Sequence, residues 1–309
     1  MKLSDSDLLA FSKANLSTFN LSKYKINKDL AIKSLQEDLN EEFNDLNSEE
    51  TKLARLKYFN IQGASADDFS ERVIKIDDKR KLICGIRHEG GNVELPFVQI
   101  IPNFSASDKE ISDFYRQYLK SLFKVFEPRY VRVWSDKIIE SVLIGSTYLV
   151  STYGQIERVA KWPKEEEISF KNISDDSYYD WYKTSYNDFH EANKDLKDRV
   201  TINSPETMRS SINDGLLKYV YLDEKKIGLI AAKRSKFLGH EGFYFNEILI
   251  DKGFKGTRLA RAIQRKFITE FSKPNDFIWG TVDYQNKPSY KTAVSNGRTP
   301  VRFECFIPV

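Results

Sequence analysis

The feature that most constrains this chain is a strand–turn–helix–strand pattern between residues 243 and 283. The apolar run 243–250 predicts a strand, 256–272 predicts a basic amphipathic helix, and 277–283 predicts a second strand. The turn at 251–256 that leads into the helix carries two glycines and two lysines. A helix that starts after such a turn presents unpaired backbone N–H groups and the positive end of its dipole. The pattern therefore predicts an anion site, with phosphate or pyrophosphate as the simplest guest.

Residues 254–260 resemble the acyl-CoA pyrophosphate loop of the GCN5-related N-acetyltransferases. In that family an aromatic residue and an Arg or Gln typically precede Gly-x-Gly-x-Gly or Ala. Here Lys255 stands at the Arg/Gln position, Gly256 at the first glycine and Ala260 at the last position. Arg258 replaces the middle glycine, which departs from the pattern.

A second segment carries the same resemblance further along the chain. Asn286, Ser289, Ala293 and Gly297 have the spacing of the family's Asn-x-x-Ala-x-x-x-Tyr-x-x-x-Gly segment. Ala293 occupies the place of the tyrosine that often serves as general acid, which is a second departure. The resemblance covers roughly residues 166–309, about half of the chain.

The resemblance implies an acyl-CoA N-acyltransferase fold, which is α/β with a mixed central sheet and flanking helices. It implies an N-acyltransferase that moves an acetyl or other acyl group from acyl-CoA to a primary amine of a small molecule or peptide. In the family the pantetheine arm lies between two splayed parallel strands, here 243–250 and 277–283. The cofactor-binding residues that this implies are Ile248, Ile250, Lys255, Gly256, Thr257, Arg258, Leu259, Ala260 and Asn286.

Glu247 is the candidate general base, because it is a carboxylate inside an otherwise apolar strand, where burial raises the pKa towards the working range. The alternative is a solvent-facing Glu paired with a nearby Lys. Strand alternation predicts that Asn246 points to the opposite face. Tyr290 lies one helical turn before position 293, so Tyr290, or else Tyr284, is the candidate donor of a proton to the leaving thiolate.

Two of the implied cofactor residues have a second interpretation. The guanidinium of Arg258 could reach a phosphate, or it could be a solvated charge on the helix. As the third residue of a helical turn, Arg258 is expected not to need a positive φ. Asn286 could contact the pantetheine arm, cap the helix that starts before Pro288, or do both.

The chain of 309 residues is long enough for two domains, and a charged, Pro-bearing segment at 161–167 predicts the boundary. We predict an accessory or degenerate acetyltransferase-like domain at 1–162 and the acetyltransferase domain at 163–309, possible tandem copies of one fold. The first half repeats the strand–helix–strand order, but 105–108 (Ser-Ala-Ser-Asp) lacks the glycine and the basic residue of the second turn. An unrelated α/β domain explains the same order.

Composition limits the partners and the compartment. Lys and Arg (48) nearly balance Asp and Glu (45), so the net charge of +3 gives no indication of a nucleic-acid partner. The two cysteines lie far apart and the three histidines fall in different segments, so no metal site is predicted. The N-terminus lacks a signal-peptide profile, and no apolar run approaches the ~18 residues of a membrane helix. We therefore expect a cytoplasmic protein that spans no membrane.

Two rival functions remain open at this level. Transferases that take the acyl group from aminoacyl-tRNA pair two similar domains, but they generally lack a good CoA pyrophosphate loop. A non-catalytic module that binds CoA or a partner protein would show the departures at Arg258 and Ala293.

Overall fold

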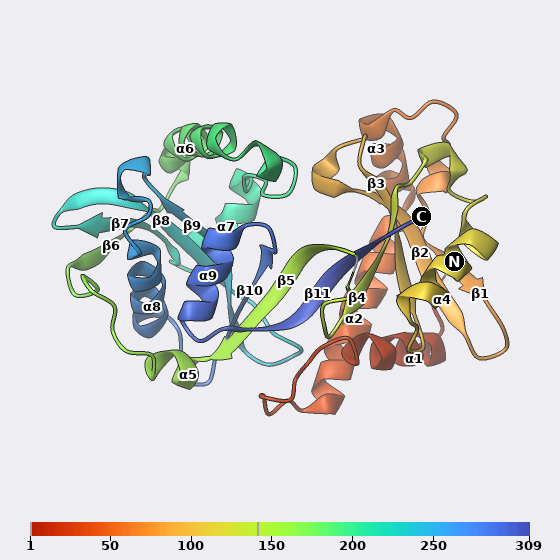
Figure 1. The fold of residues 1–309 in the computed structure, drawn as a ribbon, viewed down its shortest axis with the longest axis horizontal. Helices are drawn as coiled ribbons and strands as arrows, with labels where there is room; N and C mark the ends of the chain where they lie inside the picture. The colour runs from red at the N-terminus through yellow and green to blue at the C-terminus, as the bar shows by residue number, and fades with distance from the viewer. Residues whose placement is uncertain (1, 141) are drawn as a thin grey trace. The chain divides into compact units, whose positions relative to one another are not determined.

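The computed structural model describes residues 2–140 and 142–309, which form two compact units (Figure 1). Unit 1 contains the described residues up to Gly145 together with Val301–Val309, and unit 2 contains Ser146–Pro300. No helix in the described part of the chain is long and apolar enough to cross a membrane.

The units do not coincide with the predicted domains 1–162 and 163–309. Residues 146–162 belong to unit 2, and the last nine residues belong to unit 1. Strand pairing is the reason. Ser146–Thr152 of strand β5 (Leu143–Thr152) pairs antiparallel with strand β10 (Phe277–Asp283) of unit 2. Strand β11 (Thr299–Pro308) pairs antiparallel with strand β4 (Tyr130–Ser135) of unit 1. Each unit therefore completes its sheet with a strand that lies far away in sequence.

Unit 1 is a mixed sheet with helices. Its strands run in the order β1 (Arg72–Lys75), β2 (Lys81–His88), β3 (Pro96–Pro102), β4 and β11. Its helices are α1 (Asp5–Leu16), α2 (Lys28–Leu46), α3 (Glu49–Phe59) and α4 (Asp108–Phe114), the last followed by a π-helical turn at Tyr115–Leu119. Strands β3 and β4 pair in parallel over three residues, from Phe97↔Tyr130 to Gln99↔Arg132.

Unit 2 has the same kind of sheet. Its strands run in the order β5, β10, β9 (Gly242–Ile250), β8 (Lys225–Arg234), β7 (Leu217–Leu222) and β6 (Ile168–Asn172). Its helices are α5 (Tyr153–Glu157), α6 (Tyr179–Ala192), α7 (Pro205–Asn213), α8 (Leu259–Phe271) and α9 (Lys287–Ser295). Among the described residues of this unit, β9 pairs with β10 in parallel and the other neighbouring strands pair antiparallel.

Two apolar clusters lie on the two faces of the unit 2 sheet. On one face Phe243 and Phe245 of β9 pack with Ile263 and Phe267 of α8, whose apolar residues recur at helical spacing. On the other face Leu249 packs with tyrosines of α6 and with α7. Removing these side chains from water stabilises the packing of the helices on both faces of the sheet, by roughly 25 cal/mol per Å² of apolar surface buried. The predicted fold class, α/β with a mixed sheet and flanking helices, is confirmed.

Candidate active site

A cleft opens in unit 2 where β9 and β10 separate. Their parallel pairing starts at Gly242↔Phe277 and stops at Tyr244↔Trp279, after which β9 pairs only with β8. A pocket of about 280 Å³ lies at this separation. Its lining includes Tyr244, Phe245, Asn246, Glu247, Ile248 and Leu249 of β9 and Gly280, Thr281, Val282 and Asp283 of β10. The two strands that sequence analysis predicted as splayed are splayed in the structure.

A β-bulge interrupts β9 beside the cleft. Ala231 of β8 pairs with Glu247 and the next residue pairs with Phe245, so Asn246 has no partner in the ladder. An extra residue in one strand shifts the alternation of side chains. Asn246 donates from Nδ2 to Ser211 Oγ of α7 over 2.8 Å, and Glu247 contacts α6. The prediction that these neighbours point to opposite faces was wrong, because regular alternation does not hold across a bulge.

Glu247 accepts hydrogen bonds from several donors. Tyr182 of α6 donates its hydroxyl to Oε2 over 2.5 Å, and Tyr186 donates as well. Asn203 Nδ2 is 3.4 Å from Oε2, and the backbone N–H of Ile248 donates to Oε1 over 2.8 Å. Burial raises the pKa of Glu247 above its ordinary value, although these donors act in the opposite direction. The carboxylate is thus held at the cleft wall by these donors, with its pKa raised by burial.

The turn before α8 leaves consecutive backbone donors free. Gly256 has φ of 79° and Arg258 has φ of 66°, and the helix starts at Leu259 rather than at the predicted Gly256. No side chain caps α8, and within the described residues no acceptor is recorded for the N–H groups of residues 256–260. All the residues from Lys255 to Arg258 are exposed. The turn therefore presents exposed N–H donors at a helix N-terminus, the kind of group that binds anions.

The prediction that Arg258 needs no positive φ was wrong. Arg258 takes the left-handed conformation at the position where the family has its middle glycine. A side chain with a Cβ adopts this conformation at a cost of about 1–2 kcal/mol. The chain keeps the shape of the loop without the residue that adopts it most easily.

The remaining predicted site residues fall into two groups. Asn286 caps α9 by accepting from the N–H of Ser289 over 3.4 Å, and it also lines the cleft, so the cap is confirmed and the contact with the pantetheine arm stays a prediction. Ile248 lines the cleft, and the side chains of Ile248 and Ile250 pack towards α8. Tyr290 is not among the cleft-lining residues; its ring packs edge-on against Tyr284 at 5.5 Å.

Sequence analysis missed four residues that the fold brings to the cleft. Tyr186 and Asn203 bind the candidate base, and Arg199 forms an ion pair with Asp283 at 3.5 Å. Arg298 is 2% exposed and lines the same cleft. The sequence could have indicated Arg298 as a site residue, because it directly follows Gly297, the last residue of the segment that resembles the family. It could have indicated Tyr186 as well, because Tyr186 stands four residues after Tyr182 and so lies on the same helix face.

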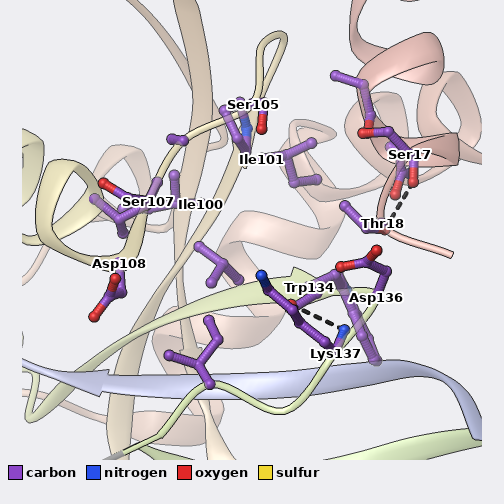
Figure 2. Close-up of a pocket in the computed structure, with 18 of the residues that line it drawn as sticks. Ser17, Thr18, Ile100, Ile101, Ser105, Ser107, Asp108, Trp134, Asp136 and Lys137 are labelled. Carbon is purple, nitrogen blue, oxygen red and sulfur yellow. Dashed lines mark hydrogen bonds between the residues drawn. The ribbon is translucent and has the colours of Figure 1, made fainter. Parts of the chain in front are cut away.

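Unit 1 has a pocket of about 680 Å³ in the corresponding place (Figure 2). It lies beyond the last parallel pair of β3 and β4, and Figure 2 shows Ile100, Ile101 and Trp134 from these strands around it. The N-terminus of α4 borders this pocket. Ser107 Oγ accepts from the N–H of Glu110 over 3.3 Å, and Glu110 Oε2 accepts from the N–H of Ser107 over 2.9 Å. This capping box occupies two of the backbone donors at the start of α4 and places the Glu110 carboxylate beside them.

The structure is similar to those of several known proteins. A GCN5-related N-acetyltransferase from Sphaerobacter thermophilus matches with 12% sequence identity and a TM-score of 0.49. The match covers 82% of this chain and 88% of that chain. An acetyltransferase of the GNAT family from Colwellia psychrerythraea matches with 11% identity, 83% and 96% coverage and a TM-score of 0.46. A Drosophila protein matches with 9% identity, 100% and 98% coverage and a TM-score of 0.44. Protein-family models and curated protein sequences give no match.

These likenesses concern the arrangement of helices and strands. Two of these proteins are described as members of the family that residues 254–260 and 286–297 resemble. The chemistry has to be derived from the side chains and backbone groups that line the cleft of unit 2.

Proposed function

We propose that unit 2 is an acyl-CoA-dependent N-acyltransferase that moves an acetyl or other acyl group to a primary amine of a small molecule or peptide. One observation carries the proposal. A cradle of N–H groups, those of residues 256–260, follows the end of β9, while Glu247 lies in the cleft wall nearer the last parallel pair of β9 and β10. An elongated donor with a pyrophosphate at one end and a reactive thioester at the other fits this layout.

In this proposal the donor lies along the cleft. The backbone of residues 255–260 holds the pyrophosphate, and the backbones of Ile248 and Ile250 together with Asn286 hold the pantetheine arm. Arg199 lies in the segment between α6 and α7, and its ion pair with Asp283 of β10 borders the cleft. Such positioning supplies most of the rate advantage of a bimolecular transfer.

The transfer uses Glu247 as the general base. Its carboxylate takes a proton from the amine as the nitrogen attacks the thioester carbon and the C–N bond forms. A backbone N–H at the Asn246 bulge stabilises the oxyanion, since the bulge frees this stretch from the β8 ladder. The C–S bond then breaks, and CoA leaves as a thiolate that takes its proton from water. Tyr290 is assigned no role, because it does not line the cleft.

A binding assay followed by a transfer assay tests the proposal. Acetyl-CoA and free CoA should raise the melting temperature of the full chain by mass action. The chain should then release free thiol from acetyl-CoA in the presence of a panel of primary amines. If neither compound raises the melting temperature or binds by calorimetry, the proposal is wrong.

A second candidate is a module that binds CoA without catalysis. Ala293, fully buried where the family often has its tyrosine, favours it. Single-turnover measurements separate the candidates: the module binds acetyl-CoA stoichiometrically, but no amine from the panel releases thiol. The uncapped cradle also favours CoA over aminoacyl-tRNA as the donor.

A further inference from the structure

Arg298 stands at the narrow end of the unit 2 cleft. Its guanidinium lies over the ring of Phe245, 4.9 Å from the centroid, and a Cβ placed on Gly280 would be 3.3 Å from Nη1. Phe245 and Gly280 are the first residues of β9 and β10 beyond their last parallel pair. The side chain therefore lies where the two strands begin to separate.

The charge of Arg298 has no partner of opposite sign among the described residues. Its Nε and Nη1 are buried without a hydrogen bond, and no carboxylate pairs with it. Burial lowers the pKa of Arg298 to about 9, so the guanidinium remains protonated near neutral pH. A buried charge without a counter-charge is unfavourable, and side chains of this kind are normally paired.

The same unit shows how a buried guanidinium is otherwise accommodated. Arg265 of α8 is 6% exposed, and its Nη1 donates to Glu165 Oε1 over 2.5 Å. Its Nε and Nη2 donate to the carbonyl oxygens of Val159 and Glu157 over 2.8 and 3.0 Å. Every nitrogen of Arg265 has an acceptor, whereas Arg298 opens on a cleft.

We infer that the donor's acyl group carries a free carboxylate, which Arg298 binds; the preferred donor is a monothioester of CoA with a short dicarboxylic acid. This inference rests on the proposed function. With the pyrophosphate in the cradle after β9, the thioester points back along the strand towards Phe245, about 17 Å for five residues of strand. The terminal carboxylate of such an acyl group would meet the guanidinium and supply the acceptors that it lacks. An acetyl group would leave the charge unpaired.

Matched probes test the inference on the full chain. Malonyl-CoA and succinyl-CoA are compared with 3-methylbutanoyl-CoA and 4-methylpentanoyl-CoA, which replace the carboxylate oxygens by methyl groups. Calorimetry should show that at least one acid binds roughly tenfold or more tightly than its neutral match, as a charge-assisted pair requires. Arg298→Gln should reduce that preference to less than about twofold and leave the Kd for free CoA unchanged.

The control variant is Lys291→Gln, which removes one charge from an exposed position of α9 and should keep the full preference.

If CoA binds but neither acid is preferred, or if Arg298→Gln keeps the preference, the inference is overturned while the proposed function stands. If Arg298→Gln slows turnover of acetyl-CoA without any acid preference, Arg298 acts on the thiolate and the inference fails. If CoA itself does not bind, both proposals fail. Should Arg298→Gln not fold, Arg298→Met in the same comparison replaces it.

Discussion

The two units share a pattern of five strands with one parallel pair, to which unit 2 adds a sixth strand, and they differ in which polar groups are paired near that parallel pair. In unit 2 the helix after the parallel strand has no side-chain cap, β9 carries a bulge with a carboxylate, and Arg298 has no counter-charge. In unit 1 the helix caps itself through Ser107 and Glu110, β3 pairs with β2 without a register shift, and Arg132 is paired with Glu304 at 3.2 Å. Polar groups that pair with one another beside the parallel strands are not left for a ligand there.

This difference supports a division of labour between the units. We propose that unit 1 is a degenerate copy of the same fold that binds no acyl-CoA. The larger volume of its pocket does not change this, since Ser107 and Glu110 cap each other at the start of α4 and place a carboxylate where an anion would bind. Size alone is a weaker guide to function than free polar groups aimed at a shared space.

The largest expected effect concerns the base. Glu247→Gln should lower kcat by roughly 10²–10⁴-fold, the usual contribution of a general base. In the wild type the rate should fall as the pH drops through the raised pKa of Glu247, because the protonated carboxyl cannot accept a proton. That acidic limb should vanish in the variant. Wild-type turnover by Glu247→Gln at pH 7 would show that another group is the base.

The cradle of unit 2 can be compared with its counterpart in unit 1. Gly256→Glu places a negative charge where the pyrophosphate would bind, and two like charges about 4 Å apart near a surface repel by about 4 kcal/mol. The Kd for CoA should rise roughly 100–1,000-fold in calorimetry. Ser105→Glu places the same charge in the corresponding turn of unit 1 and should leave the Kd unchanged. A loss of binding in Ser105→Glu instead would move the site to unit 1.

The two arginines should respond oppositely to an apolar replacement. Arg132→Met removes the ion pair with Glu304 and should lower the free energy of unfolding by about 3 kcal/mol. Arg298→Met removes a buried charge that has no partner, so the free energy of unfolding without ligand should stay level or rise. Urea denaturation of the unliganded proteins measures both. A large loss of stability in Arg298→Met would mean that its guanidinium is satisfied within the fold.

The smallest expected effect concerns the cap of α4. Ser107→Ala removes the acceptor for the N–H of Glu110 and should destabilise unit 1 by about 1 kcal/mol. The affinity for CoA should not change, because the cradle lies in unit 2. Thermal denaturation and a CoA titration of the same sample provide the two readings. Tighter or additional CoA binding after the cap is removed would show that unit 1 is a masked site.

Local pattern was enough to predict most strands and helices near the site. The apolar run 243–250, the amphipathic helix that follows and the strand at 277–283 depend on neighbours within a few residues, so periodicity reveals them. The cap at Asn286 was predicted for the same reason. Helix α1 and strand β5 were not predicted.

The sequence by itself determined the fold class, the position of the turn before α8 and the candidate carboxylate Glu247, because each depends on residue types at short spacing. Tertiary structure decided the rest. The bulge at Asn246 depends on how β9 meets β8, and the unit boundary depends on which sheets take β5 and β11. Whether a charge such as Arg298 is paired depends on atoms brought together from distant segments. Spacing along the chain encodes local geometry, whereas pairing across a sheet and burial are properties of the whole packed unit.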